Sequence, residues 1–137
     1  MDNTEFPPPS LPLVTPANRY FWCGGADGQL WILRCDDCGL WIHPFAGRCP
    51  KCRSASVSPQ PTSGRGTVVG FTVNHQKWSP DLPTPYVVAV VELADQADIR
   101  LMTNLPRTTI ADVCVGMPVK VYFDRHDDVW LPQFEAA

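Results

Sequence analysis

The chain has 137 residues, of which 45% are hydrophobic and 18% charged, enough for one globular domain or two very small ones. Its net charge of −3 and its apolar content exclude an intrinsically disordered chain and argue against binding of a phosphate backbone. No apolar run approaches the roughly 18 residues of a membrane span, and the acidic start, Met1–Glu5, lacks the features of a secretory signal. We therefore expect a cytoplasmic protein.

The N-terminal segment is rich in proline: five of the fifteen prolines lie within the first sixteen residues. Proline fixes its own φ and restricts the residue before it, so this segment is expected to be extended. Two interpretations stay open. The segment is either a disordered tail or an arm that lies on this protein or on a partner, with Phe6, Leu11 and Leu13 as apolar anchors.

A short helix is predicted over residues 17–23, because Thr15 and Pro16 form a typical helix start and two glycines follow the helix. The helix carries three consecutive aromatic residues, Tyr20, Phe21 and Trp22. So many aromatic side chains do not suit a solvated helix of this length. They are expected either to pack on the body of the protein or to form a docking surface.

Two pairs of cysteines form the strongest motif. Two residues separate the members of each pair and ten residues separate the pairs, which consist of Cys35, Cys38, Cys49 and Cys52. Two C-x-x-C turns that face each other supply the four thiolates of a tetrahedral zinc ion, and a shell closed by four cysteines indicates a structural metal. Iron in a rubredoxin-like site is the alternative occupant. Two disulfides or a redox-active pair are the competing interpretations, but these suit a secreted chain or a βαβ context.

The remaining cysteines and histidines show no catalytic pattern. Cys23 and Cys114 do not belong to a C-x-x-C pair, and the apolar neighbours of Cys114 are typical of a buried, inert thiol. His43 lies between the cysteine pairs and could replace a cysteine, but a strand position explains it as well. His75 and His126 lie far from it in the sequence. We therefore assign no catalytic residue, because acid–base chemistry needs a convergent set of such groups.

The second half of the chain is predicted to form a small β barrel. Five strand-like runs rich in β-branched and aromatic residues are predicted over residues 67–73, 86–93, 99–105, 119–123 and 129–134. A short helix fits at 108–113, between the third and fourth runs. This layout matches an OB-fold, with a small sandwich as the competitor.

The predicted architecture is therefore mainly β, with an N-terminal aromatic helix, a zinc ribbon and a C-terminal five-stranded OB-fold barrel. We place the Pro-rich arm and helix at residues 1–28, the ribbon at 29–63 and the barrel at 64–137.

The charge of the barrel bears on what it binds. Residues 66–137 carry five basic and nine acidic side chains, a balance of −4 that repels nucleic acid. The long loop around Lys77 and Trp78 is the best single candidate for a binding segment. The alternative is that these two residues belong to a plain loop.

Across nearly its whole length the chain resembles a known family, the OB-fold proteins with a rubredoxin-like zinc ribbon catalogued as domain of unknown function family thirty-five. The shared motifs are Phe21-Trp22-x-Gly24, Cys35-x-x-Cys38-Gly39, Cys49-Pro50-x-Cys52, Gly64-x-Gly66-Thr67-Val68, the run 85–93 and Gly116-Met117-Pro118-Val119. The chain departs from the family in two turns. Arg53 stands where the family usually has glycine, and the hairpin at residues 95–98 also lacks its usual glycine.

The resemblance implies a function that the residues alone permit but do not specify. Members of this family look like accessory subunits of thiolase-superfamily acyl-CoA enzymes, including aldolases that shorten steroid side chains by retro-aldol cleavage. On this basis we expect a non-catalytic scaffold subunit in a hetero-oligomer, with acyl-CoA bound through the partner. The candidates for binding the partner or CoA are Tyr20, Phe21, Trp22, Lys77 and Trp78, of which Lys77 and Trp78 could meet a CoA phosphate and adenine. The alternatives are a stand-alone acyl-CoA-binding module and a nucleic-acid-binding OB protein.

Overall fold

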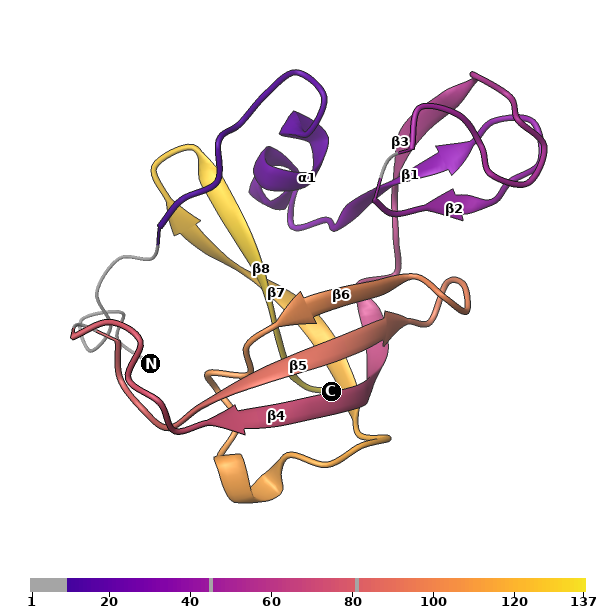
Figure 1. The fold of residues 1–137 in the computed structure, drawn as a ribbon. Helices are drawn as coiled ribbons and strands as arrows, with labels where there is room; N and C mark the ends of the chain where they lie inside the picture. The colour runs from indigo at the N-terminus through magenta and orange to yellow at the C-terminus, as the bar shows by residue number, and fades with distance from the viewer. Residues whose placement is uncertain (1–9, 45, 81) are drawn as a thin grey trace.

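The computed structural model describes residues 10–44, 46–80 and 82–137 and shows a mainly β protein (Figure 1). A short N-terminal helix, a three-stranded ribbon and a five-stranded barrel follow one another along the chain. Phe6, predicted as an anchor of the arm, lies outside the described residues. No helix within the described ranges is long and apolar enough to cross a membrane.

The N-terminal helix is shorter than predicted. Helix α1 spans Arg19–Cys23 and continues as the 3₁₀ helix η2, Gly24–Asp27. Its N-cap is Asn18 rather than Thr15, because a hydrogen-bonded turn precedes it: Thr15 N–H donates to Asn18 Oδ1 (2.7 Å) and Arg19 N–H donates to the Thr15 carbonyl (2.9 Å).

The ribbon is an antiparallel sheet in the order β2-β1-β3, with β1 Trp31–Cys35, β2 Trp41–Ile42 and β3 Val57–Pro61. The sequence reasoning missed β3, because Pro59 and Pro61 argue against a strand. Both prolines are exposed on an edge strand that pairs only on its β1 side within the described sheet. A proline at an outward-facing edge position removes no ladder hydrogen bond.

The barrel contains the five predicted strands in the order β6-β5-β4-β7-β8. Their bounds are β4 Arg65–Asn74, β5 Tyr86–Leu93, β6 Arg100–Thr103, β7 Pro118–His126 and β8 Val129–Ala136. The predicted short helix between the third and fourth strands is the 3₁₀ helix η3, Ile110–Asp112. Strands β6 and β8 approach each other, with Thr103 Oγ1 and Gln133 Oε1 3.3 Å apart, so the OB-like barrel is nearly closed.

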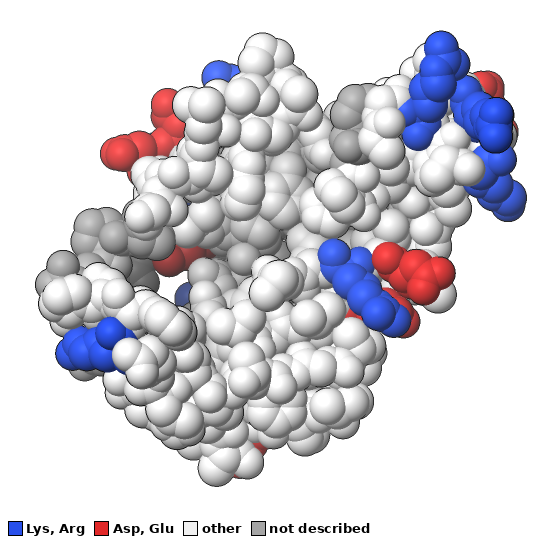
Figure 2. All heavy atoms as spheres, viewed as in Figure 1, with Lys and Arg blue, Asp and Glu red and all other residues white. Residues whose placement is uncertain are grey.

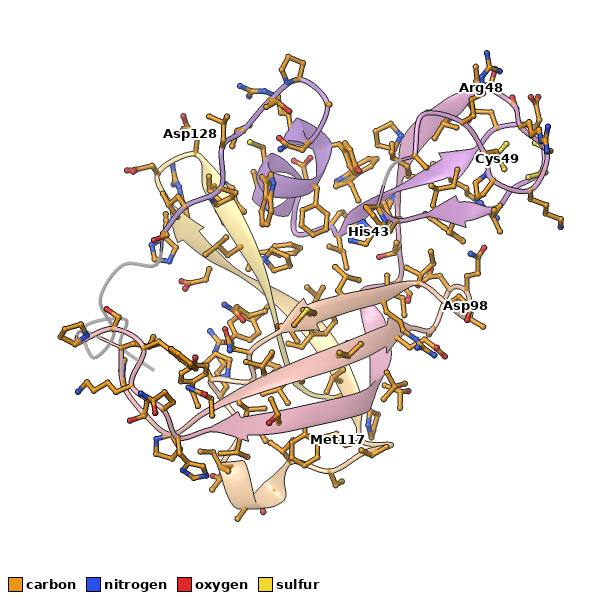
Figure 3. All side chains as sticks on the ribbon, viewed as in Figure 1. His43, Arg48, Cys49, Asp98, Met117 and Asp128 are labelled. Atoms are coloured by element: carbon orange, nitrogen blue, oxygen red, sulfur yellow. The ribbon has the colours of Figure 1, made fainter. Side chains whose placement is uncertain are left out.

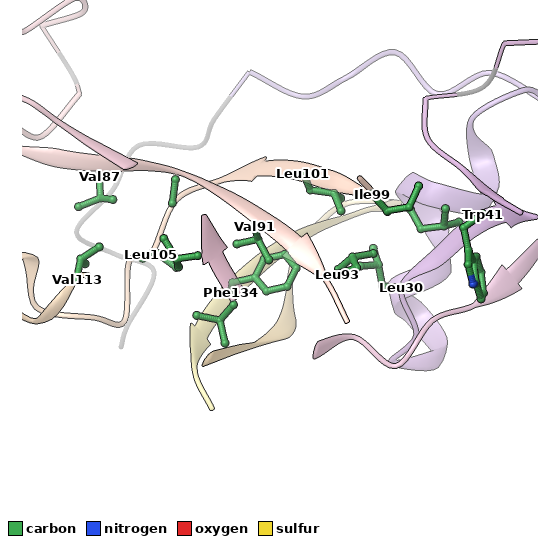
Figure 4. Close-up of a cluster of buried hydrophobic side chains, with 14 residues drawn as sticks. Leu30, Trp41, Val87, Val91, Leu93, Ile99, Leu101, Leu105, Val113 and Phe134 are labelled. Carbon is green, nitrogen blue, oxygen red and sulfur yellow. The ribbon is translucent and has the colours of Figure 1, made fainter. Parts of the chain in front are cut away.

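One hydrophobic core joins the ribbon to the barrel. Leu30, Ile32 and Trp41 belong to the same buried cluster as the barrel residues, among them Val91 and Phe134 (Figure 4). A second, smaller cluster lies around the cysteines and includes Leu33 and Ile42. Because the larger core spans both parts, the predicted boundary at residues 63 and 64 does not separate two independent packing units. The boundaries themselves stay predictions.

Candidate metal centre and partner surface

The four predicted metal-ligating cysteines come together at the far end of the ribbon. Their Sγ atoms all lie within 4.8 Å of one another. Cys35 and Cys52 sulfurs are 3.5 Å apart, as are those of Cys38 and Cys49. A tetrahedral zinc ion with Zn–S bonds of about 2.3 Å needs sulfurs roughly 3.8 Å apart. All four residues are unbridged thiols, so the arrangement fits a metal ion and not two disulfides.

Backbone N–H groups donate hydrogen bonds to two of these sulfurs. The N–H of Cys38 donates to Cys35 Sγ and the N–H of Cys52 donates to Cys49 Sγ, both at 3.5 Å. The backbone N–H groups of Cys52 and Lys51 lower the pKa of the Cys49 thiol to about 6, and that of Cys38 likewise lowers the pKa of Cys35. The pKa values of the Cys38 and Cys52 thiols are instead raised by burial and by the neighbouring cysteine side chains. The turns therefore favour the thiolate, the form that binds metal, at the first cysteine of each pair.

The two C-x-x-C turns, here called knuckles, have the same backbone geometry but differ in the residue that follows the second cysteine. Gly39 N–H donates to the Cys35 carbonyl (3.0 Å), and Arg53 N–H donates to the Cys49 carbonyl (2.8 Å). Both residues have a left-handed backbone, with φ of 79° and 65°. This conformation costs glycine little but strains a residue with a Cβ. Arg53 therefore occupies a position suited to glycine, which agrees with the glycine usually found there in the family that the sequence resembles.

The ribbon is fastened to the barrel by one side-chain amide. Gln96, in the turn between β5 and β6, accepts from the Trp41 N–H (2.9 Å) and donates through Nε2 to the Trp41 carbonyl (3.0 Å). Sequence reasoning assigned no role to Gln96. No local pattern marks it, since its partner lies 55 residues away.

The aromatic residues of α1 lie at the junction of ribbon and barrel, and one of them contacts His43, which is labelled in Figure 3. Tyr20 packs on the cysteine-side cluster, whereas Phe21 packs on the larger core. Phe21 also stacks on the ring of His43 at 5.4 Å and meets Trp22 edge to face at 4.8 Å. Tyr20 and Phe21 therefore pack on the body of the protein, and Trp22 contacts Phe21, while all three keep a partly exposed surface. Their part in binding a partner or CoA stays a prediction.

These aromatics also line a shallow groove between α1, the residues after β2, and strand β6. The groove has a volume of about 630 Å³, and its lining includes Tyr20, Phe21, Trp22, His43 and Met102. Burial lowers the pKa of His43, so this side chain is held neutral in the groove wall. His43 lies outside the cysteine cluster and is not one of the grouped ligands.

Lys77 and Trp78 lie away from this groove, in the loop between β4 and β5. Trp78 is 74% exposed, and its indole Nε1–H donates to Asn74 Oδ1 (3.3 Å). Asp81 of the same loop lies outside the described residues. The structure thus brings the helical aromatics together but does not place Lys77 or Trp78 among the groove residues.

The sequence-based prediction for Cys114 was wrong. Its thiol is exposed, because Val113 takes the buried position and the chain turns outward after η3. Cys23 is half-buried. The histidines lie on separate elements, and His126 pairs with Asp124 at 3.0 Å at the end of β7.

Comparison with known protein families accounts for most of the chain. Residues 22–60 match the family described as the rubredoxin-like zinc ribbon domain of ChsH2, and residues 59–124 match the C-terminal OB-fold domain of ChsH2.

Three curated relatives are similar. The chain is 31% identical over 140 residues to a "Probable enoyl-CoA hydratase alpha subunit" of Thermomonospora curvata, covering 99% of the chain. It is 35% identical over 109 residues to the "3-oxo-4,17-pregnadiene-20-carboxyl-CoA hydratase alpha subunit" of Mycobacterium tuberculosis, covering 79%. The chain spans 43% and 34% of the lengths of these two subunits. A "DUF35 domain-containing scaffold protein" of Methanocaldococcus jannaschii is 33% identical over 95 residues, with 68% of this chain and 66% of the relative covered.

A solved structure is also similar to this chain. It is described as "Ltp2-ChsH2(DUF35) aldolase" and superposes with a TM-score of 0.81 at 31% sequence identity. The match covers 92% of this chain and 98% of the compared chain.

Proposed function

Because the chain belongs to the DUF35 family of ChsH2-related proteins, we propose that it is a non-catalytic accessory subunit of a thiolase-superfamily acyl-CoA enzyme in the cytoplasm. The enzyme it would bind and stabilise is a retro-aldol lyase that acts on a steroid side chain held as a CoA thioester. The observation that carries this proposal is the match to nearly the whole of a ChsH2 chain solved as part of an aldolase.

Two further observations support an accessory role. One relative is itself named a scaffold protein. The described histidines do not converge: His43 packs on Phe21 in the groove, His75 lies in the exposed loop after β4, and His126 lies at the end of β7. The catalytic groups would then belong to the partner enzyme subunit, with this chain holding it in its active shape.

For the ribbon we propose a structural zinc ion held by Cys35, Cys38, Cys49 and Cys52. Bound there, zinc would act as a closed four-thiolate cross-link and would leave no open position for substrate. The chain's own part is to present the four sulfurs on two hydrogen-bonded turns. Iron is distinguished directly, because an iron–thiolate site is coloured and a zinc site is not. Metal analysis with an absorption spectrum of the purified protein decides between the two.

The test of the accessory role uses the tagged full-length chain in extract of its native cell. We expect a thiolase-like subunit in a stoichiometric complex, identified by mass spectrometry and sized by light scattering. The complex should cleave a steroid acyl-CoA in the retro-aldol direction, whereas the purified chain alone should show no turnover. Turnover by the chain alone, or its recovery as a monomer that binds acyl-CoA by itself, would overturn the proposal.

A further inference from the structure

Strand β5 is apolar on both of its faces. Its inward residues are buried in the barrel core, namely Val87, Ala89, Val91 and Leu93. The alternate residues face outward and are only partly covered, and three of these four are apolar or aromatic: Tyr86, Val88 and Val90. An antiparallel sheet that faces water on one side normally alternates apolar with polar residues. The outer face of β5 therefore has the composition of a covered surface.

The neighbouring strands extend this apolar face. Val90 pairs with Met102 of β6 on one side and with Gly70 of β4 on the other, and cross-strand partners point to the same face. Met102 is 75% exposed. We call this surface, formed by residues 70, 72, 86, 88, 90 and 102, the outer β4–β6 face. Among the described residues, the extensive contacts of β5 are with β4 and β6 themselves.

Charges border this face but do not enter it. Arg100 and Glu92 form an ion pair at 3.2 Å. They are also cross-strand partners, and each lies two residues along its strand from the outward-facing pair of Val90 and Met102. Lys77 lies in the loop beyond the opposite end, near Asn74. Figure 2 looks onto this side of the molecule, and its charged atoms lie at the margins of a broad uncharged area. A partner that buries this area must itself be uncharged there, since an unpaired buried charge is costly.

Trp78 stands at the loop end of the same face. Asn74 pairs with Tyr86, so its side chain points outward, and it accepts the indole N–H of Trp78. The single polar atom of this side chain is thus satisfied within the chain, whereas the ring is left 74% exposed. A fixed, exposed indole of this kind suits an apolar pocket on another protein.

Gly70 indicates what kind of molecule covers the face. Its φ is not left-handed, so the β-bulge between residues 68 and 70 does not require glycine there. A Cβ at this position would meet nothing within 4 Å, so packing within the chain does not require glycine either. Glycine inside a strand weakens it by roughly 0.5–1 kcal/mol relative to alanine. Beyond the bulge, a glycine here leaves room for the close approach of another backbone, which favours a polypeptide as the occupant.

The geometry points to the outer β4–β6 face as the surface that docks on the partner enzyme subunit. The partner supplies an uncharged apolar polypeptide segment whose backbone passes over Gly70, with a pocket for the indole of Trp78. This inference rests on the proposed function, because the occupant is the subunit that the chain is proposed to serve.

The test measures the affinity of chain variants for the enzyme subunit recovered with the tagged protein and then purified separately. Gly70→Arg puts a charged side chain at the centre of the face into space that is empty in the free chain. Trp78→Ala removes the exposed ring. We expect Gly70→Arg to weaken binding about 100-fold or more and Trp78→Ala about 30-fold, the range of interface hot spots. Val115→Arg is the matched control, since Val115 is 63% exposed outside this face.

A second measurement needs no variant. Dilute peroxide oxidises exposed methionine, so Met102 should be oxidised several-fold more slowly in the complex than in the free chain. Met117, which is partly buried outside this face, is the internal reference.

The outcomes separate this inference from the proposed function. If no enzyme subunit is recovered, the proposed function fails and this inference fails with it. If the subunit binds both variants as tightly as it binds the unmodified chain and leaves Met102 unprotected, only the docking surface is wrong. Self-association of the chain that Gly70→Arg abolishes would name a second copy as the occupant and would also overturn the inference.

Discussion

The side-chain amide of Gln96 bonds to both backbone polar groups of Trp41, accepting from its N–H at 2.9 Å and donating to its carbonyl at 3.0 Å. In this way a side chain of the barrel replaces a missing neighbouring strand at the edge of the ribbon. Trp41 itself is buried in the core shared with the barrel. The amide of this β5–β6 turn residue therefore helps, together with the shared core, to fix the position of the metal-binding ribbon relative to the barrel.

We predict that Gln96→Ala destabilises the protein by about 2–3 kcal/mol, because it leaves two partly buried backbone groups of Trp41 unpaired. Gln96→Glu should cost less, since a carboxylate still accepts from the Trp41 N–H but cannot donate to its carbonyl. Urea unfolding of the metal-loaded chain measures both, with the exposed Gln29→Ala as control. Equal stability of the Ala variant and the unmodified chain would show that water replaces the amide.

Arg53 offers a prediction of the opposite sign. Its left-handed φ of 65° costs a residue with a Cβ about 1 kcal/mol relative to glycine, so Arg53→Gly should stabilise the metal-loaded chain by about this amount. Gly39→Ala, at the equivalent position of the first knuckle, should destabilise it similarly. Thermal unfolding compares the two. Lys51→Gly is the control in the same turn, because Lys51 lacks a positive φ and glycine there brings no relief.

How far the sequence predicted these features depends on how local each of them is. The β-branched and aromatic residues of the run 86–93 located β5, and the spacing of Cys35 and Cys38 identified a metal-binding turn, because both patterns arise from neighbouring residues. Strand β3 was missed, because only its pairing with β1 shows that Pro59 sits on an outer edge. The two hydrogen bonds between Gln96 and Trp41 were missed for the same reason, since they form between residues far apart in the sequence.

The exposure of Cys114 shows a second limit of prediction from the sequence. Its apolar neighbours suggested burial, but the direction of a side chain in a turn depends on where the chain bends rather than on composition. The outer face of β5 shows the reverse case. Its sequence is apolar except for Glu92, which by itself does not distinguish a strand buried on both sides within its own chain from one that a partner covers.

Metal removal should affect more than the ribbon. In a four-cysteine site the free energy of metal binding contributes directly to folding, and the larger core passes from Leu30 and Trp41 into the barrel. We predict that chelation, or Cys49→Ser, unfolds the ribbon and also lowers the melting temperature of the barrel. Differential scanning calorimetry with and without chelator tests this. The exposed Cys114→Ser is the matched control and should melt like the unmodified chain.

An unchanged barrel transition after chelation, with the ribbon lost, would contradict this expectation. It would show that Leu30 and Trp41 stay docked on the barrel without the metal.

His43 gives a pH dependence whose sign follows from its environment. Burial against Phe21 lowers the pKa of His43 below its ordinary value of 6.5, so the unfolded chain binds a proton at a higher pH than the folded chain does. The contribution of neutral His43 to stability is therefore fully present above pH 6.5 and is lost as the pH falls through that value towards the lower folded pKa. We predict that stability declines between pH 7.5 and 5.5, and that His43→Gln, which cannot titrate, shows a shallower decline.

Urea unfolding of the metal-loaded protein at half-unit intervals over this pH range measures the difference between the two chains. His75→Gln is the matched control, because His75 is exposed in the loop after β4 and its replacement should leave the profile unchanged. Metal content is measured at each pH, so that release of the ion by protonated cysteines is separated from titration of His43. Parallel profiles for the unmodified chain and His43→Gln at constant metal content would mean that the imidazole binds its proton equally well in the folded and unfolded states.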